Sequence, residues 1–288
     1  MLFASLRYLL ASAFLLVCVL ASGTAEFSNV SKRDWLLLIA LGVPGYTIAQ
    51  GLQFVGLAFI TAISTTFVLN LTPIVVALLG YPLLREVPRL RQWAGIAIAL
   101  LGAYIYFGRL PEGNEATGLA VVAVANIAWA LYLVLVRKSS KKPILPNLAL
   151  TATTMTVGSL LMFSTAIAVE GWRTPSLGVV ELIVWMAAVN TAGAFLIWNM
   201  VLRHMRAYEL SMLQNTMLIQ IAVLALLFLG EEITLRMLFG MALVMIGVAV
   251  VQIRGAASPA QTQLGAMQQL SGLERASWSR TRRVRLAP

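Results

Sequence analysis

The sequence is poor in charged residues, cysteine and histidine, and each shortage excludes a class of protein. Only 11% of the 288 residues are Asp, Glu, Lys or Arg, whereas soluble domains carry about 25%. The single cysteine, Cys18, excludes a disulfide framework and a cysteine-based metal site. The single histidine, His204, excludes motifs that need two histidines. We therefore expect no metal, no cofactor and no enzymatic reaction.

Apolar residues are abundant instead: they make up 60% of the chain and form long runs between short clusters of charge. A helix needs about 20 apolar residues to cross the hydrocarbon core of a membrane, where only helices and closed barrels satisfy the backbone hydrogen bonds. The runs are too long and too evenly apolar for the alternating strands of a barrel. The sequence thus predicts an all-α, polytopic membrane helix bundle. Its nine predicted spans are approximately 2–20, 35–56, 61–83, 92–108, 117–136, 147–169, 180–202, 208–229 and 235–253.

The net charge of +10 is typical of nucleic-acid binders, but the basic residues lie in loops and the tail rather than along one face. We therefore expect no nucleic acid. One set of alternate loops, together with the tail, holds 17 of the 21 Lys and Arg residues. By the positive-inside rule this side is cytoplasmic, which places the C-terminus inside and, with nine spans, the N-terminus outside. Residues 255–288 are predicted to be a basic, disordered cytoplasmic tail.

The chain contains an internal repeat, which becomes visible when the sequence is shifted by 145 residues against itself. Besides many apolar matches, the shift aligns polar residues and glycines, which chance rarely does. These pairs are Asn70 with Asn215, Glu86 with Glu231, Arg91 with Arg236, Gly95 with Gly240, and Gly102 with Gly247. We predict a first repeat over 1–108 and a second over 117–253. Span 117–136 has no partner, so the first repeat is expected to lack its first helix.

A complete repeat would have five spans, and an odd number of spans inverts the second copy relative to the first. Inverted repeats are typical of secondary transporters, whose solute site lies near the midplane between the copies. Each pair of glycines seven residues apart lies on one face of its helix, which indicates close helix packing. The sequence therefore predicts two inverted five-helix repeats, with one helix missing.

Two segments resemble a known family. They are LNLTPIVVALLGYPLLREVPRLRQWAGIAIALLGAYIYF and NTAGAFLIWNMVLRHMRAYELSMLQNTMLIQIAVLALLFLGEEITLRMLFGMALVMIGVAVV. The second segment places the turn LGEEITL before a two-glycine helix. The chain resembles the EamA-type permeases of the drug/metabolite transporter superfamily over nearly all of residues 1–253. This resemblance implies ten helices, cytoplasmic termini and residence in a bacterial inner membrane. Because this chain begins near the family's second helix, either its start codon is placed too late or it is a nine-helix variant.

Polar side chains inside spans are costly in lipid and usually face the bundle interior or a cavity. In span 35–56, Tyr46, Gln50 and Gln53 recur at spacings of four and three residues, so they share one helix face. The preceding residues 42–45 (GVPG) are expected to loosen the helix and free backbone groups for a solute. A packing kink that binds no solute explains these residues equally well.

Other spans hold amides and tryptophans, the groups that orient small molecules in apolar pockets. The repeat partners Asn70 and Asn215 fit this role, although interhelical hydrogen bonds are the favoured explanation for them. Trp198 fits an interfacial aromatic belt nearly as well. The predicted substrate-binding residues are Tyr46, Gln50, Gln53, Asn70, Asn126, Trp129, Asn190, Trp198, Gln214 and Asn215.

These patterns predict a secondary transporter that moves a small organic metabolite, amino acid or drug-like solute by alternating access. The expected partners are that solute and the lipid bilayer, and an oligomer is possible but unsupported by the sequence. One alternative is an inactive or scaffold membrane protein derived from a truncated transporter. An intramembrane enzyme is less favoured, because the sequence has no G-x-S-x-G motif and no pair of aspartates at a midplane.

Overall fold

The computed structural model describes residues 1–23, 27, 30–84, 89–108, 112–139, 144–172, 174–197 and 217–252. These residues belong to one compact unit, and no strand occurs among them. The π-helical turns, labelled η, continue the helices that precede them. In chain order the elements are α1 (Leu2–Ser22), α2 (Lys32–Gly42), η2 (Val43–Ile48), α3 (Ala49–Gly56), α4 (Ala62–Leu69), α5 (Thr72–Leu84), α6 (Leu90–Phe107), α7 (Gly113–Ser139), α8 (Asn147–Glu170), α9 (Leu177–Trp185), η3 (Met186–Gly193), η4 (Ala225–Leu229) and α12 (Leu235–Gln252).

Eight helical stretches of the described chain are long and apolar enough to cross a membrane. They match eight of the nine predicted spans to within a few residues. The ninth prediction, 208–229, is described only over Met217–Leu229, which is helical. Residues 198–216 and the predicted tail 255–288 lie outside the described residues. The eight stretches are Leu2–Ser22, Lys32–Gly56, Ala62–Leu83, Leu90–Phe107, Gly113–Val136, Asn147–Glu170, Leu177–Ile197 and Leu235–Gln252.

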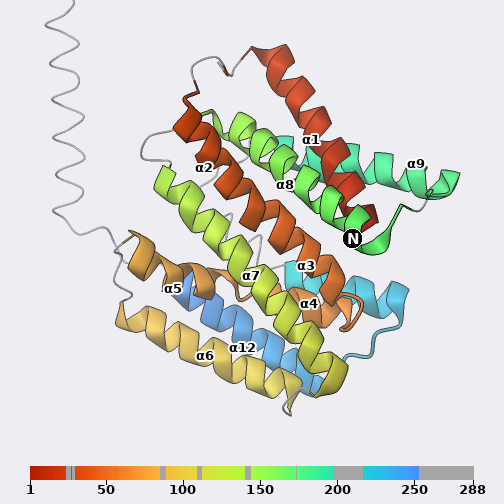
Figure 1. Cartoon of the computed structure of the whole chain (residues 1–288). Helices are drawn as coiled ribbons and strands as arrows, with labels where there is room; N and C mark the ends of the chain where they lie inside the picture. Colours follow the sequence, from red (N-terminus) through yellow and green to blue (C-terminus); the bar gives the residue numbers. More distant parts are fainter. Residues whose placement is uncertain are drawn as a thin grey trace, which may run out of the picture. The chain divides into compact units, whose positions relative to one another are not determined.

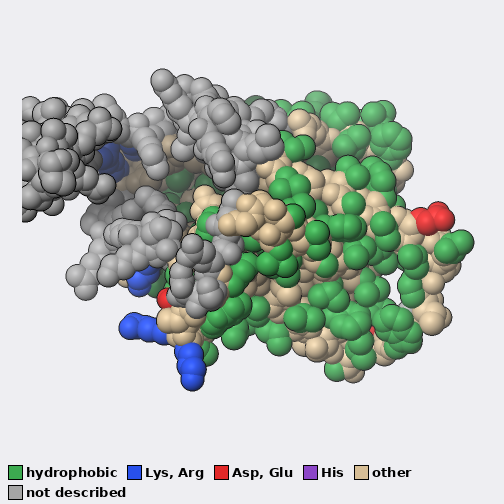
Figure 2. Space-filling view, turned by 90° about the horizontal axis from the view of Figure 1, so that it is seen from above, with side chains coloured by type: hydrophobic (Ala, Val, Ile, Leu, Met, Phe, Trp, Pro, Cys, Tyr) green, Lys and Arg blue, Asp and Glu red, His purple; other side chains and the backbone are tan. Residues whose placement is uncertain are grey.

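Large hydrophobic side chains are exposed on most of these helices. Leu100 and Tyr104 on α6 and Phe239 on α12 are each more than half exposed. Figure 2 shows hydrophobic side chains over much of the described surface, with the charged side chains near its edges. Soluble proteins rarely leave large contiguous apolar patches in water. These faces instead suit the hydrocarbon core of a membrane, so the predicted all-α membrane bundle is confirmed.

Helices α6 and α12, which the repeat makes equivalent, lie side by side although they are far apart in the sequence (Figure 1). A methyl group on Gly95 would lie 2.7 Å from the carbonyl oxygen of Gly247, and one on Gly240 would lie 2.7 Å from that of Gly102. The repeat maps Gly95 onto Gly240 and Gly102 onto Gly247, so it exchanges these two contacts. A two-fold rotation that relates the two repeats exchanges the two contacts in this way. The same rotation inverts the second repeat relative to the first.

Helices α1 and α8, also equivalent in the repeat, form a second contact between the two copies (Figure 1). Each of them packs on the π-helical turn of the other repeat: η2 lies on α8, and η3 lies on α1. The largest buried hydrophobic clusters lie at these two places, one around α1 and α8 and one around α6 and α12. The repeats are therefore held together by equivalent helices on both sides of the bundle.

The two π-helical turns occupy equivalent positions, since residues 43–48 shift onto 188–193. The predicted loosening at residues 42–45 takes the form of η2, because Pro44 supplies no N–H and crowds the preceding turn. No proline occurs in η3, and nothing in its sequence indicates a π turn. A second proline break separates α4 from α5 at Asn70 and Leu71, just before Pro73.

Helix α7, the predicted span without a partner, packs on the first repeat through η2, α3 and α5. Small residues allow the approach: Gly56 lies against Val122, and Gly45 lies against the ring of Tyr132. The repeat partner of Gly45 is Asn190 in η3, and its side chain is exposed. The two copies therefore differ at this face: α7 packs on Gly45 of the first copy, whereas the side chain at the equivalent position of the second copy is exposed.

Candidate functional site

Four aromatic side chains meet where η2 faces α1 and α7. Tyr46 of η2 is buried, and its ring lies edge-on to Tyr8 of α1 at a centroid distance of 6.1 Å. The same ring lies edge-on to Trp129 and Tyr132 of α7, at 6.3 and 5.6 Å, and those two rings stack on each other at 5.1 Å. Such arrangements are favourable for aromatic pairs. We call Tyr8, Tyr46, Trp129 and Tyr132 the aromatic cluster.

Two glycines make room for the ring of Tyr46. A methyl group on Gly158 of α8 would lie 2.5 Å from Cβ of Tyr46, and one on Gly45 would lie 2.7 Å from Cδ2 of Tyr132. The Tyr46 hydroxyl is buried beside Tyr132 and Thr154 but makes no well-formed hydrogen bond with any described residue. The cluster is therefore closely packed around one buried hydroxyl.

A polar group lies next to the cluster, between α1 and α3. The Tyr8 hydroxyl donates a hydrogen bond to Oε1 of Gln50 at 2.6 Å. The guanidinium carbon of Arg7 lies 4.6 Å from the ring centroid of Tyr8 and 5.3 Å from that of Phe54. Its Nε is buried and has no hydrogen-bond partner among the residues that the structure describes. The structure thus brings the predicted Tyr46, Gln50 and Trp129 together with Arg7 and Tyr8.

Arg7 and Tyr8 are not among the residues predicted from the sequence. A signal for Arg7 is nevertheless present, because it lies inside the apolar run that forms α1. An arginine within a span is costly unless it faces a polar interior, and this rule alone would have identified it. Tyr8 has no comparable signal, since a tyrosine in an apolar helix is common and only the fold shows that it faces Gln50.

The predicted Asn126 uses its amide to join two helices. Its Nδ2 donates to the carbonyl oxygen of Val68 at 2.9 Å, and its Oδ1 lies 2.6 Å from the hydroxyl of Thr72. The side chain is almost fully buried. These bonds attach α7 to the break between α4 and α5, where the helical hydrogen bonds are interrupted. Asn126 therefore holds the helices that carry the cluster.

The remaining predicted residues are spread more widely. Asn70 donates to the carbonyl oxygen of Thr66 in its own helix at 3.1 Å. Gln53 is half-buried and Asn190 is exposed, and neither forms a hydrogen bond with the aromatic cluster within the part of the chain that the structure describes. Three further predictions lie outside the described residues, namely Trp198, Gln214 and Asn215.

The side chains at and around the cluster offer aromatic faces, hydroxyls, one amide and one guanidinium. A few convergent polar groups in apolar surroundings are typical of sites that hold organic molecules. Among the residues with described positions, no three His, Cys, Asp or Glu side chains lie close enough to hold a metal ion. The arrangement is suited to binding a solute.

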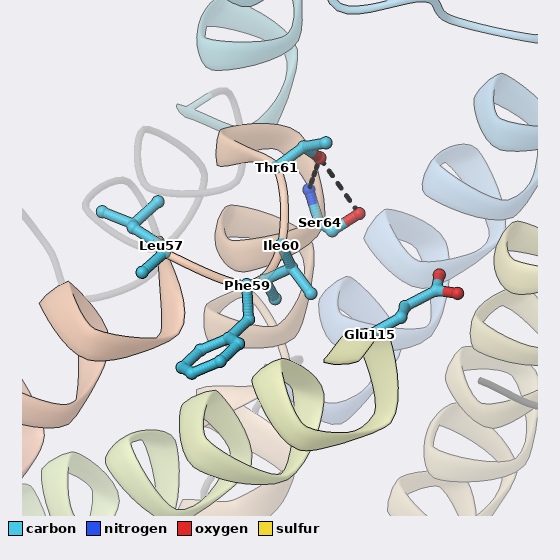
Figure 3. A pocket seen from close by; sticks show the side chains of 7 residues that line it. Leu57, Phe59, Ile60, Thr61, Ser64 and Glu115 are labelled. Atoms are coloured by element: carbon cyan, nitrogen blue, oxygen red, sulfur yellow. Dashed lines mark hydrogen bonds between the residues drawn. The ribbon is translucent and has the colours of Figure 1, made fainter. Parts of the chain in front are cut away.

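A separate cavity of about 460 Å³ opens between the loop that joins α3 to α4 and the start of α7. Figure 3 shows Thr61 and Ser64 joined by hydrogen bonds at the start of α4, with Glu115 on α7 across from them. None of the predicted site residues lines it. The lining residues are Leu57, Ala58, Phe59, Ile60, Thr61, Ser64 and Glu115.

The carboxylate of Glu231 caps α4 next to this cavity. It accepts hydrogen bonds from the backbone N–H groups of Ala62 at 2.8 Å and Ile63 at 3.1 Å. A carboxylate at a helix N-terminus satisfies free donors and interacts favourably with the helix dipole.

We expect Glu231→Ala to lower the free energy of unfolding by about 1–2 kcal/mol, measured by thermal or denaturant unfolding in detergent. The matched variant Glu232→Ala removes an exposed neighbour and should change little; equal losses in both would contradict the cap.

Comparisons with known proteins give a consistent result. The model of the EamA-like transporter family matches residues 1–108 and 116–253. The uncharacterized transporter YyaM of Bacillus subtilis (strain 168) is 28% identical over 262 residues, which cover 85% of this chain and 82% of that protein. An uncharacterized transporter of Archaeoglobus fulgidus is 26% identical over 199 residues, covering 67% and 66%. A protein crystal structure shares the fold with a TM-score of 0.63 at 19% identity, covering 87% of this chain and 86% of that one.

Proposed function

The chain belongs to the EamA-like transporter family, and from this premise we propose that it moves a small organic solute by alternating access between its two repeats. The solute is a metabolite, an amino acid or a drug-like molecule. The relatives from Bacillus subtilis and Archaeoglobus fulgidus are themselves named as transporters. Membership of a transporter family also argues against the intramembrane enzyme.

The observation that carries this proposal is the pair of π-helical turns at equivalent positions of the repeats. Interrupted helices form the solute sites of many inverted-repeat transporters, and π turns occur frequently at functional sites. The first turn, η2, carries Tyr46 into the aromatic cluster, and the second, η3, packs on α1, which carries Tyr8. A rocking of the repeats would move both turns, so a solute at the cluster would be exposed to each side alternately.

The depth of the cluster agrees with a transport site. At 1.5 Å per helical residue, Gln50 lies about 9 Å and Tyr46 about 15 Å from the end of the span at Gly56. Because the hydrocarbon core is about 30 Å thick, Tyr46 would lie near its midplane. The distribution of Lys and Arg supports an orientation with the C-terminus in the cytoplasm of a bacterium and the solute path across its inner membrane.

Counterflow into proteoliposomes tests the proposal. We expect the full chain to exchange labelled amino acids or aromatic metabolites in a saturable manner. Gln50→Leu should weaken this exchange about tenfold, because it removes the amide that accepts the Tyr8 hydroxyl. The control Asn114→Leu removes an exposed amide at the start of α7 and should leave exchange unchanged. Equal exchange by both variants would mean that the solute binds elsewhere.

A scaffold or an inactive transporter is the second candidate, and the exposed Asn190 is the observation that favours it. An amide that faces lipid within a span is costly, and the neighbouring Trp185 and Val189 are also more than half exposed. A face that requires a covering helix suits a protein that associates with another membrane protein. A folded chain without counterflow of any solute would favour this second candidate.

A further inference from the structure

We propose that the transported solute carries a single carboxylate attached to an aromatic or apolar body. In this arrangement the carboxylate binds Arg7, and the body lies against the aromatic cluster. This substrate class rests on the transporter function proposed above, and it assigns a binding role to a charged residue that the sequence pattern left aside.

Arg7 brings a positive charge into a span without a matching carboxylate. It lies within α1, one of the helices long and apolar enough to cross a membrane. In the described part of the chain, it forms no ion pair with an Asp or Glu. Glu170, at the end of the neighbouring α8, accepts a hydrogen bond from the backbone N–H of Leu2 at 3.0 Å instead. Charges within spans are normally paired, so a negative ligand is the missing partner.

Two aromatic rings hold the guanidinium of Arg7 in place. Its central carbon lies 4.6 Å from the ring centroid of Tyr8 and 5.3 Å from that of Phe54. Contacts with ring faces fix the plane of a guanidinium, whose fork of N–H donors matches a carboxylate. Across the described ranges of the chain, the buried Nε has no hydrogen-bond partner. Because an unpaired buried donor is costly, a carboxylate oxygen at this place would relieve the cost.

Gln50 adds a second donor close to the same place. The Tyr8 hydroxyl donates to Oε1 of Gln50, so the oxygen of the amide is engaged. Its nitrogen donates no hydrogen bond within the described part of the chain, and it is therefore taken as the second donor. Tyr8 thus contacts both groups, with its ring under Arg7 and its hydroxyl on Gln50. A guanidinium and an amide nitrogen beside one tyrosine form a donor pair for one oxyanion.

The aromatic cluster lies next to this donor pair, because Tyr8 belongs to the cluster and contacts both donors. The ring of Tyr8 lies 6.1 Å from that of Tyr46, behind which Trp129 and Tyr132 stack on each other. Cations also bind to aromatic faces, but Arg7 would repel a cation here. A neutral aromatic solute would leave Arg7 uncompensated, and a polyanion would need more positive groups than this single arginine. An aromatic or apolar monocarboxylate satisfies both parts of the site.

Three probes with one ring system and different charge test the inference. They are labelled indole-3-acetate, indole-3-acetamide and tryptamine, in counterflow with the full chain in proteoliposomes. We expect saturable exchange of indole-3-acetate, with a half-saturation concentration at least tenfold below that of the amide, and no exchange of tryptamine. Arg7→Gln should raise the value for indole-3-acetate at least tenfold and leave that for the amide unchanged.

Two further variants distinguish a loss of solute binding from a failure to fold and from a change in net charge. Arg33→Gln removes an exposed charge at the start of α2 and should match the wild type. Arg7→Lys keeps the charge, so the preference for the acid should persist even if Arg7→Gln does not fold. The preference of the wild-type protein for the acid over the amide is measured without any variant.

The possible failures are distinguishable. Equal exchange of the acid and the amide by the wild type, or an unchanged preference for the acid in folded Arg7→Gln, would overturn the inference and leave the transporter function standing. Exchange of other solutes, with no exchange of any of the three indole probes, would likewise overturn the inference and leave the transporter function standing. No exchange of any solute by the folded wild-type chain would overturn the proposed function, and this inference with it.

Discussion

Replacing Gly247 by leucine is expected to abolish the folded protein in detergent. A methyl group on Gly247 would already lie 2.6 Å from the carbonyl oxygen of Gly95 and 2.6 Å from the backbone nitrogen of Ala99. Both are backbone atoms, which cannot rotate away as a flexible side chain can. The larger side chain would separate α6 from α12 along one of the two contacts that join the repeats. Size-exclusion chromatography of a fluorescent fusion measures the loss.

A smaller change at the same place gives a graded test. Gly247→Ala should lower the free energy of unfolding by about 1–3 kcal/mol, the usual cost of overpacking. The control is Gly80→Ala, because a methyl group on Gly80 would lie in open space, with no described atom beyond its own stretch of helix within 4 Å. That control should be neutral or slightly stabilising, since alanine favours a helix more than glycine does. If both variants unfolded alike, the glycine contact would not hold the repeats together.

Truncating Tyr46 is expected to cause the second large loss. Its side chain is among the largest that are fully buried, and it contacts Tyr8, Trp129 and Tyr132. Tyr46→Ala would leave a cavity among these rings and should lower the free energy of unfolding by about 3–5 kcal/mol. Counterflow should also fall, because the rings would no longer be held in position. Unfolding by heat or by denaturing detergent measures the first effect.

Tyr46→Phe is the matched control, since it keeps the ring and removes only the hydroxyl. Among the residues with described positions, that buried hydroxyl has no well-formed hydrogen bond, so its removal should leave stability equal to or above that of the wild type. A reduction of counterflow in this variant with unchanged stability would indicate that the solute bonds to the hydroxyl. A large loss of stability in Tyr46→Phe would show instead that the hydroxyl has a structural partner.

The helices were predictable because each span must satisfy its own backbone hydrogen bonds in lipid. Apolar runs therefore marked eight of the described helices to within a few residues. Pro44, in the predicted segment 42–45, marked one break because proline cannot continue the pattern of helical hydrogen bonds. The sequence of the π turn η3 contains no proline that would indicate a break. It lies at the same position as η2 in the other repeat, a relation that becomes visible only once both turns are seen.

The candidate site was predictable only in part. Tyr46 and Gln50 share a helix face by spacing alone, and Trp129 lies on the helix that packs against them. Spacing within one helix cannot tell which residue of another helix it will meet. Asn126 illustrates the limit, because its position within a span suggested a ligand while its actual partners, Val68 and Thr72, lie on a helix break far away in the sequence.

The sequence by itself determined the membrane class, the span positions and the repeat, because these depend on local hydropathy and on residues that recur at a constant offset. Matching glycines in the sequence also indicated close packing. Only the tertiary structure decided that Gly95 meets Gly247 rather than Gly240, and that Arg7 of α1 meets Phe54 of α3 and lies beside the aromatic cluster. The physical reason is that contacts between helices depend on how each helix is rotated about its axis and on its position along that axis. Both are fixed by the packing of all the helices together.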